Sequence, residues 1–145
     1  MKLIKQIFLI ILVLKTLASY SQTKNEKDQL YFSDGVEINI IKTDCIDKAS
    51  GVEKQLLVVE LINTNMYPVN VSFKKEIWYD NNCQTCNSNS DEYTVNQIII
   101  DNSTVIGGCK SENKSLNIFV KMLNLENVRQ LTNYELKDIK IEKVN

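Results

Sequence analysis

Residues 56–62 read Leu-Leu-Val-Val-Glu-Leu-Ile, and residues 69–73 read Val-Asn-Val-Ser-Phe. The first run is apolar at both odd and even positions except at Glu60, so both of its faces are apolar, which is typical of a strand in the middle of a sheet. The second run alternates apolar and polar residues, which indicates a half-buried strand. Asn63-Thr64-Asn65 ends the first run, and Pro68 precedes the second at a point where a missing N–H is tolerated. This stretch therefore predicts two consecutive strands.

The same pattern of short β-branched or aromatic runs, separated by Asn, Asp, Ser and Gly, continues on both sides of this stretch. Lys74-Lys75 interrupts the alternation and predicts a bulge or a sheet edge, and the parity also shifts near Lys137-Asp138. Leu125, Val128 and Leu131 are spaced by three residues and predict one or two helical turns. The strand at 69–73 is expected to continue through 77–79 after this interruption. The other expected strands are 36–40, 93–100, 104–106, 116–122 and 134–144, and the expected loops are 44–54 and 80–92.

About seven strands result, which predicts an all-β, immunoglobulin-like antiparallel β-sandwich with a short helical turn before the last strand. A small antiparallel barrel is the alternative. The sequence has no Cys…Trp…Cys pattern across facing strands, so an antibody-type domain is not expected.

Residues 1–21 are interpreted as a secretory signal peptide. Lys2 and Lys5 give a positive start, residues 7–14 are apolar, and Ser19-Tyr20-Ser21 supplies a small-residue cleavage site. Spanning a bilayer takes about 20 apolar residues, so no membrane span is expected after cleavage. We expect a periplasmic or secreted protein with an N-terminal segment at 22–35 and a β-sandwich domain at 36–145.

The composition excludes several classes of function. The chain has 145 residues with 17 basic and 18 acidic side chains and no His. Without His, Ser–His–Asp and Cys–His catalysis and His-based zinc sites are excluded. Loss of Lys2, Lys5 and Lys15 with the signal peptide leaves 14 basic residues against 18 acidic ones, a net charge near −4. Arg129 is the only Arg and no basic block occurs, so nucleic-acid binding is not expected. No catalytic residue, metal or cofactor is expected.

The four cysteines, Cys45, Cys83, Cys86 and Cys109, are expected to form two disulfides, because an exported chain with an even cysteine count is first interpreted that way. If successive strands alternate in direction, all four lie at one end of the sandwich. Bridges from Cys45 and Cys109 to the Cys83/Cys86 pair would then join three loops, although the spacing leaves all three connectivities open. The alternatives are a Cys₄ zinc site and a redox-active Cys83–Cys86 pair.

Four further residues are candidates for binding. Trp78 and Tyr79 would suit a carbohydrate platform if both rings lay exposed on one face, whereas ordinary packing is the competing interpretation. Lys74 and Lys75 would suit a partner contact, whereas protection of an exposed edge is the competing interpretation.

The segment from Asn63 to Asn65 followed by Pro-Val-Asn-Val-Ser-Phe at 68–73 resembles a turn and strand of exported bacterial β-sandwich modules. Ser-Tyr-Ser-Gln at 19–22 resembles the end of a signal peptide in Bacteroidetes-type bacteria. The resemblance implies an exported β-sandwich protein of that group, and it carries no activity and no functional residue.

These observations predict an exported, non-catalytic binding or accessory module that contacts another protein through its loops or a strand edge. An inhibitor or immunity-type protein is a specific variant of this prediction. A carbohydrate-binding module using Trp78 and Tyr79 is the first alternative, and a Cys83–Cys86 thiol-disulfide oxidoreductase is the second.

Overall fold

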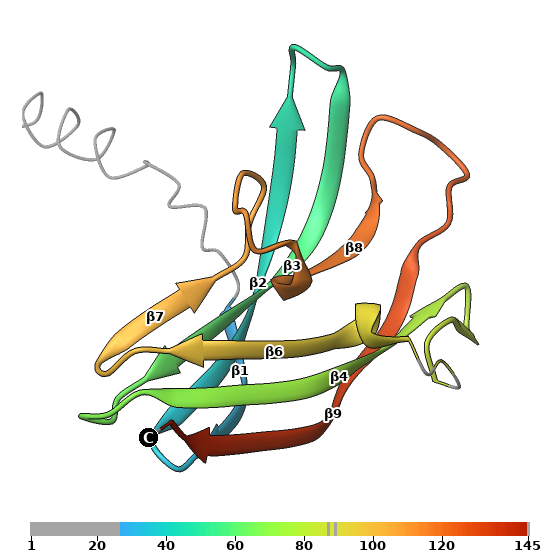
Figure 1. Ribbon diagram of the computed structural model, residues 1–145. Helices are drawn as coiled ribbons and strands as arrows, with labels where there is room; N and C mark the ends of the chain where they lie inside the picture. The colour runs from blue at the N-terminus through green and yellow to red at the C-terminus, as the bar shows by residue number, and fades with distance from the viewer. Residues whose placement is uncertain (1–26, 87, 89, 145) are drawn as a thin grey trace, which may run out of the picture.

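The computed structural model describes residues 27–86, 88 and 90–144, so the expected signal peptide at 1–21 lies outside the described residues. The described chain folds into two antiparallel sheets, one of which curls into a half-barrel (Figure 1). Its helical segments are two short 3-10 turns, η1 (Asp91–Tyr93) and η2 (Lys114–Leu116). Within this part of the chain, no helix is long and apolar enough to cross a membrane.

The first sheet has the order β1-β2-β3, and the other edge of β3 pairs with two strands lying end to end. Residues Lys54–Val58 of β3 pair with β8, and residues Glu60–Asn63 pair with β7. The strands of this sheet are β1 (Lys27–Ser33), β2 (Val36–Asp47), β3 (Val52–Asn63), β7 (Ser103–Ile106) and β8 (Asn117–Met122).

The second sheet is built around β4, which pairs with β9 along one edge and with β6 and β5 along the other. Its strands are β4 (Val69–Tyr79), β5 (Asn82–Cys83), β6 (Thr94–Ile99) and β9 (Leu131–Lys143). The chain crosses between the sheets after β3, β6 and β8. Each sheet is therefore built from strands that are distant from one another in the sequence.

The core lies between the two sheets and follows the alternation of the strands. On β4, every second residue from Val69 to Ile77 is buried, and on β2 the same holds from Val36 to Ile40. Strand residues at alternate positions share a face, so these two rows meet in the interior. The largest fully buried apolar side chains are Phe73, Ile38, Leu61, Ile99, Leu116 and Ile118.

Two sequence predictions about the secondary structure are wrong, and one strand was not predicted. Residues 44–54 are not a loop, because the β2–β3 ladder continues to the Asp47–Val52 pair and leaves a turn of four residues. The helical turn expected around Leu125 is absent, and β9 begins at Leu131 without one. The polar segment before the Ser33-Asp34-Gly35 turn is a strand, β1, although the sequence did not predict it.

The irregularity expected around Lys74-Lys75 has its cause on the opposite strand. The β4–β9 register shifts between Ser72 and Lys74, where β9 carries one extra residue and Asp138 adopts a φ of 54°. The parity shift predicted near Lys137-Asp138 is therefore confirmed as a β-bulge. The predicted edge is wrong, because β4 has neighbours on both sides.

Candidate functional site

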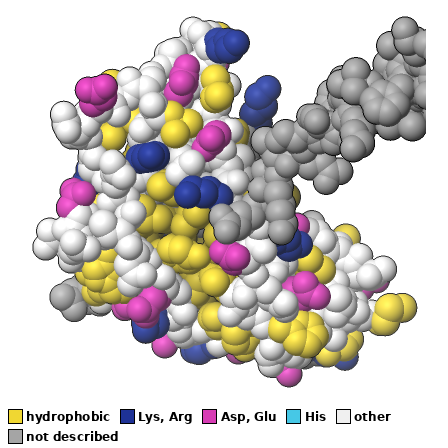
Figure 2. Space-filling model, turned by 180° about the vertical axis from the view of Figure 1, so that it is seen from behind, with side chains coloured by type: hydrophobic (Ala, Val, Ile, Leu, Met, Phe, Trp, Pro, Cys, Tyr) yellow, Lys and Arg dark blue, Asp and Glu magenta, His cyan; other side chains and the backbone are white. Residues whose placement is uncertain are grey.

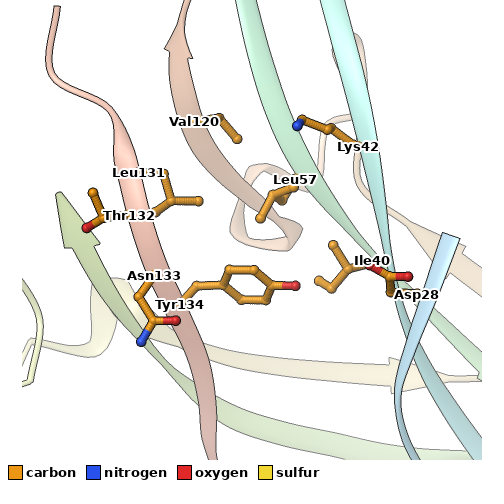
Figure 3. Close-up of a pocket in the computed structure, with 9 residues that line it drawn as sticks. All are labelled: Asp28, Ile40, Lys42, Leu57, Val120, Leu131, Thr132, Asn133 and Tyr134. Carbon is orange, nitrogen blue, oxygen red and sulfur yellow. The ribbon is translucent and has the colours of Figure 1, made fainter. Parts of the chain in front are cut away.

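An open cleft separates β9 from the β1–β2 side of the other sheet. It has a volume of about 310 Å³ (Figure 3). Figure 2 shows hydrophobic side chains gathered in the middle of the back face of the molecule, with charged side chains at the margin. The cleft is lined by Asp28, Ile40, Lys42, Leu57, Val120, Leu131, Thr132, Asn133 and Tyr134.

The strand register places two charged side chains in this apolar setting. Lys42 continues the inward parity of Val36, Ile38 and Ile40, and Asp28 of β1 pairs directly with Ile40. Both charges therefore lie on the inward face of the first sheet. The ion pairs of the described residues, Lys27–Glu60 and Lys137–Glu135, involve neither Asp28 nor Lys42. The cleft thus offers one carboxylate and one ammonium group to a ligand.

Tyr134 supplies the polar group on the opposite wall. Its ring extends from β9 across the cleft toward Ile40 and Asp28 (Figure 3). Burial raises the pKa of the Tyr134 hydroxyl, and the negative charge of Asp28 raises it further. The phenol is therefore protonated at neutral pH and acts as a hydrogen-bond donor or acceptor rather than as a base.

The cleft continues along β9 as a groove of about 430 Å³. Asn133 and Tyr134 line both the cleft and the groove. The residues that line only the groove are Leu30, Glu135, Leu136 and Ile139. The inward residues of β9 are half-buried, whereas their counterparts on β4 are buried. The second sheet therefore leaves the hydrophobic layer incompletely covered along β9.

The cysteines form two disulfides, as expected, and the structure shows which of the three connectivities left open by the spacing is formed. Cys45 of β2 is bonded to Cys109 in the loop after β7, and Cys83 is bonded to Cys86 within the loop after β4. The Cys83–Cys86 bridge lies within one short segment and connects it to no other loop. The β2–β3 hairpin tip and the loop after β4 project in different directions (Figure 1), so the placement of all four cysteines at one end is wrong.

The two disulfides use the cysteines that the alternative of a Cys₄ zinc site requires. All four thiols of the predicted Cys₄ zinc site are consumed in disulfides. Among the residues that the structure describes, no group of three or more Cys, Asp or Glu side chains is placed to hold a metal ion. The described residues therefore do not assemble the donor set that a structural zinc site needs.

Lys74 and Lys75 are not the surface pair that the sequence indicated. The Lys74 ammonium donates to the Ser88 carbonyl at 2.9 Å. Lys75 points into the sandwich, is 5% exposed, and donates to the Ser115 carbonyl at 2.7 Å. The prediction that Lys75 protects an edge or contacts a partner is wrong, because alternation along β4 turns it inward.

Trp78 and Tyr79 occupy opposite faces of β4. Tyr79 turns toward the other sheet, where its hydroxyl donates to the Phe119 carbonyl at 2.6 Å and the Arg129 guanidinium lies 4.8 Å from its ring centre. Trp78, as its neighbour on a strand, faces the other way. The two rings therefore do not form the shared flat platform that stacking on a sugar requires.

The residues lining the cleft were not among the sequence candidates. A signal for them exists in the strand parity: Lys42 stands at the position where the alternation from Val36 predicts another apolar, inward residue. A charged residue at such a position indicates either the end of the core or an opening into it. The position of Asp28 and Tyr134 opposite this opening follows from tertiary packing and not from a motif.

Comparison with protein-family models, with curated proteins and with solved structures finds no match for this chain.

Proposed function

We propose that this protein is an exported, non-catalytic module that binds another protein through the cleft between β9 and the β1–β2 edge. The observation that carries the proposal is the composition of this cleft, in which Asp28, Lys42 and the Tyr134 hydroxyl surround an apolar floor. Apolar surface supplies affinity, and a few placed polar groups supply orientation. Inhibition of a secreted enzyme, or immunity to a toxin, is a specific form of this function.

The size of the cleft favours a protein partner over a cofactor. Pockets for small molecules and cofactors occupy about 300–1,000 Å³ and enclose most of their ligand. The cleft, at about 310 Å³, is at the lower limit and is open along β9. One or two side chains from a partner suit such a volume.

Export and an immunoglobulin-like fold are parts of the same proposal. The Cys45–Cys109 bridge closes a separation of 64 residues and suits an oxidising compartment. Two antiparallel sheets with three crossings between them support an immunoglobulin-like sandwich. Such a frame presents loops and edges without offering a deep active site.

Site-specific photo-crosslinking tests the proposed function. A photo-crosslinking amino acid in place of Asn133 lies in the cleft, and the same amino acid in place of Lys48 lies on the β2–β3 turn outside it. We expect the Asn133 probe to form an adduct with an envelope protein of the source cells, and the adduct to disappear when Lys42→Glu is added. Identical adducts from both probes, or none from Asn133, contradict the proposal; an adduct of twice the chain mass reports self-association instead.

One observation favours thiol-disulfide exchange as a second candidate function. The Cys86 N–H donates to the Cys83 sulfur at 3.0 Å. Cys83 is bonded to Cys86 in the structure, and after reduction the same hydrogen bond would stabilise the Cys83 thiolate, the reactive form of cysteine. An insulin-reduction assay with Cys83→Ser as control tests this function, and turnover that is independent of Cys83 excludes it.

A further inference from the structure

The outer edge of β9 is unpaired among the described strands. β9 pairs with β4 along one edge, and β1, across the groove, pairs with β2 alone. An unpaired edge presents main-chain N–H and C=O groups that can bind a further strand. The segment before the bulge at Asp138 is the regular part of this edge.

Hydrogen bonds on the far side of β4 identify which residues of β9 present these groups. The Ile77 N–H donates to the Thr85 hydroxyl and the Ile77 carbonyl accepts from the Gln84 N–H, so both groups point away from β9. Ile77 and its cross-strand partner Tyr134 are therefore a non-hydrogen-bonded pair. In such a pair, the main-chain groups of Tyr134 point outward to the unpaired edge.

The same reasoning applies two residues further along. The Lys75 carbonyl accepts a hydrogen bond from the Thr85 hydroxyl, and Lys75 pairs with Leu136. The N–H and C=O of Leu136 therefore also point to the unpaired edge. Glu135 and Lys137 alternate with these residues, and their side chains lie on the outer face of the sheet.

The charge sequence at this edge is complementary to itself. When two copies of β9 pair antiparallel with Leu136 opposite Leu136, Glu135 of each copy lies opposite Lys137 of the other. Both cross-strand contacts then join opposite charges, and such pairs stabilise a sheet. A two-fold axis through Tyr134 would instead place Glu135 opposite Asn133, which pairs no charges.

We propose that β9 forms a continuous sheet with β9 of a second copy of this chain, with Leu136 on the two-fold axis. The two Leu136 residues exchange main-chain hydrogen bonds, and their side chains lie over the groove lined by Leu30, Leu136 and Ile139. Leu30 is 43% exposed in the single chain, so association removes apolar surface from water. The bulge at Asp138 ends the regular edge, and the two-fold symmetry closes the assembly as a dimer.

Sedimentation equilibrium of the mature chain tests the proposal with a pair of charge reversals. We expect a concentration-dependent dimer for the wild type. Glu135→Lys and Lys137→Glu each place like charges opposite one another across the axis, so each variant alone should dissociate at least tenfold more readily. An equimolar mixture of the two variants restores opposite charges at both contacts, and a heterodimer should form.

Controls separate loss of the interface from loss of the fold. Glu142→Lys lies on the same outer face beyond the bulge and should leave the dimer unchanged. Leu136→Pro removes the N–H that faces the second copy and should give a monomer, whereas Leu136→Ala keeps that N–H and should weaken the dimer less. A monomeric wild type, or a mixture of the charge variants that stays monomeric, overturns the proposal. Because the dimer covers the groove beside the cleft, the mass of the Asn133 adduct distinguishes the two proposals: twice the chain mass reports the dimer, and any other mass reports a different partner.

Discussion

The side-chain ammonium of Lys75 donates a hydrogen bond to the main-chain carbonyl of Ser115 at 2.7 Å. Lys75 stands between Phe73 and Ile77 in the inward row of β4 and is buried. Burial lowers the pKa of this ammonium, and the negative charge of Glu92 partly opposes the shift. The fold therefore holds a cationic side chain in its interior against two carbonyls, one in η2 and one at the start of β8.

Replacing Lys75 with Met should change how stability depends on pH. Because the pKa of Lys75 is lower in the folded chain than its ordinary 10.5, the wild-type protein gains stability as the pH rises toward that value. K75M lacks this gain, so its stability relative to the wild type should be highest near neutral pH and decline as the pH rises. Urea unfolding of both proteins between about pH 7 and pH 10 measures this difference.

At neutral pH the net effect of K75M should stay within about 3 kcal/mol in either direction, because two contributions offset. Removing a buried charge gains about 1–4 kcal/mol, and leaving the Ser115 carbonyl without a donor costs about 1–3 kcal/mol. Tyr79 and Tyr134 have raised pKa values and oppose the lysine trend at high pH in both proteins, so the difference isolates Lys75. A difference that is flat with pH contradicts the assignment; Lys48→Met, on an exposed turn, is the matched control.

The alternation of side chains along the strands predicted the core. The same alternation explains why the sequence did not predict the positions of Lys42 and Lys75. The parity from Val36 to Ile40 correctly identified inward residues, because burial of apolar side chains decides the face of a strand. Lys42 and Lys75 stand at inward positions of the alternating rows on β2 and β4. Because both are charged, a pattern based on hydrophobicity assigns them to the surface. Their actual positions depend on which strands lie opposite, and that information is tertiary.

Thr85 supplies hydrogen bonds to the part of β4 that lies beyond Thr94, the first residue of β6. Its hydroxyl accepts the Ile77 N–H at 2.9 Å and donates to the Lys75 carbonyl at 2.8 Å. Thr85→Val keeps the shape and leaves both buried main-chain groups unpaired, so we expect a loss of about 2–4 kcal/mol in the free energy of unfolding. Urea unfolding measures the loss, and amide exchange at Ile77 should accelerate. Thr104→Val, at an exposed position of β7, should be nearly neutral, and an equal loss there would contradict the role of Thr85.

The cysteine pairing shows a second limit of the sequence. An even count predicted two disulfides correctly, since the number depends on the compartment and not on the fold. The pairing depends on which loops approach each other, and the expected loop at 44–54 is instead a hairpin that carries Cys45 toward Cys109. With that loop misassigned, the sequence could not choose among the three possible connectivities.

Removing the two disulfides should have unequal effects on stability. Loop-closure entropy predicts about 4 kcal/mol for the bridge that spans 64 residues and about 2 kcal/mol for the one that spans 3. We therefore expect the Cys45→Ala/Cys109→Ser variant to unfold at clearly lower urea concentration than the Cys83→Ser/Cys86→Ser variant. Equal midpoints would show that the entropic difference is not what stabilises the chain. Thiol counting on the denatured wild type should find no free thiol.

Asn63 joins the β3–β4 and β6–β7 connections at one end of the sandwich. Its side-chain amide donates to the carbonyls of Tyr67 and Ile100 at 2.9 and 3.0 Å, and its side-chain oxygen accepts the Asn65 N–H at 2.9 Å. The residue is 1% exposed, so its side chain makes these bonds inside the fold.

Asn63→Ala should therefore destabilise the protein by about 3–5 kcal/mol, since several buried groups lose their partners and each costs about 1–3 kcal/mol. Asn63→Asp keeps the shape and the acceptor but exchanges the donor for an oxygen facing two carbonyls, so it should be at least as damaging at neutral pH. Asn82→Ala removes an exposed side-chain bond to the Asp80 carbonyl and is the control, expected within about 0.5 kcal/mol of the wild type. Thermal and urea unfolding of the three variants measure the order of their stabilities. A tolerated Asn63→Asp would mean that the acceptor, and not the amide donor, stabilises the turns.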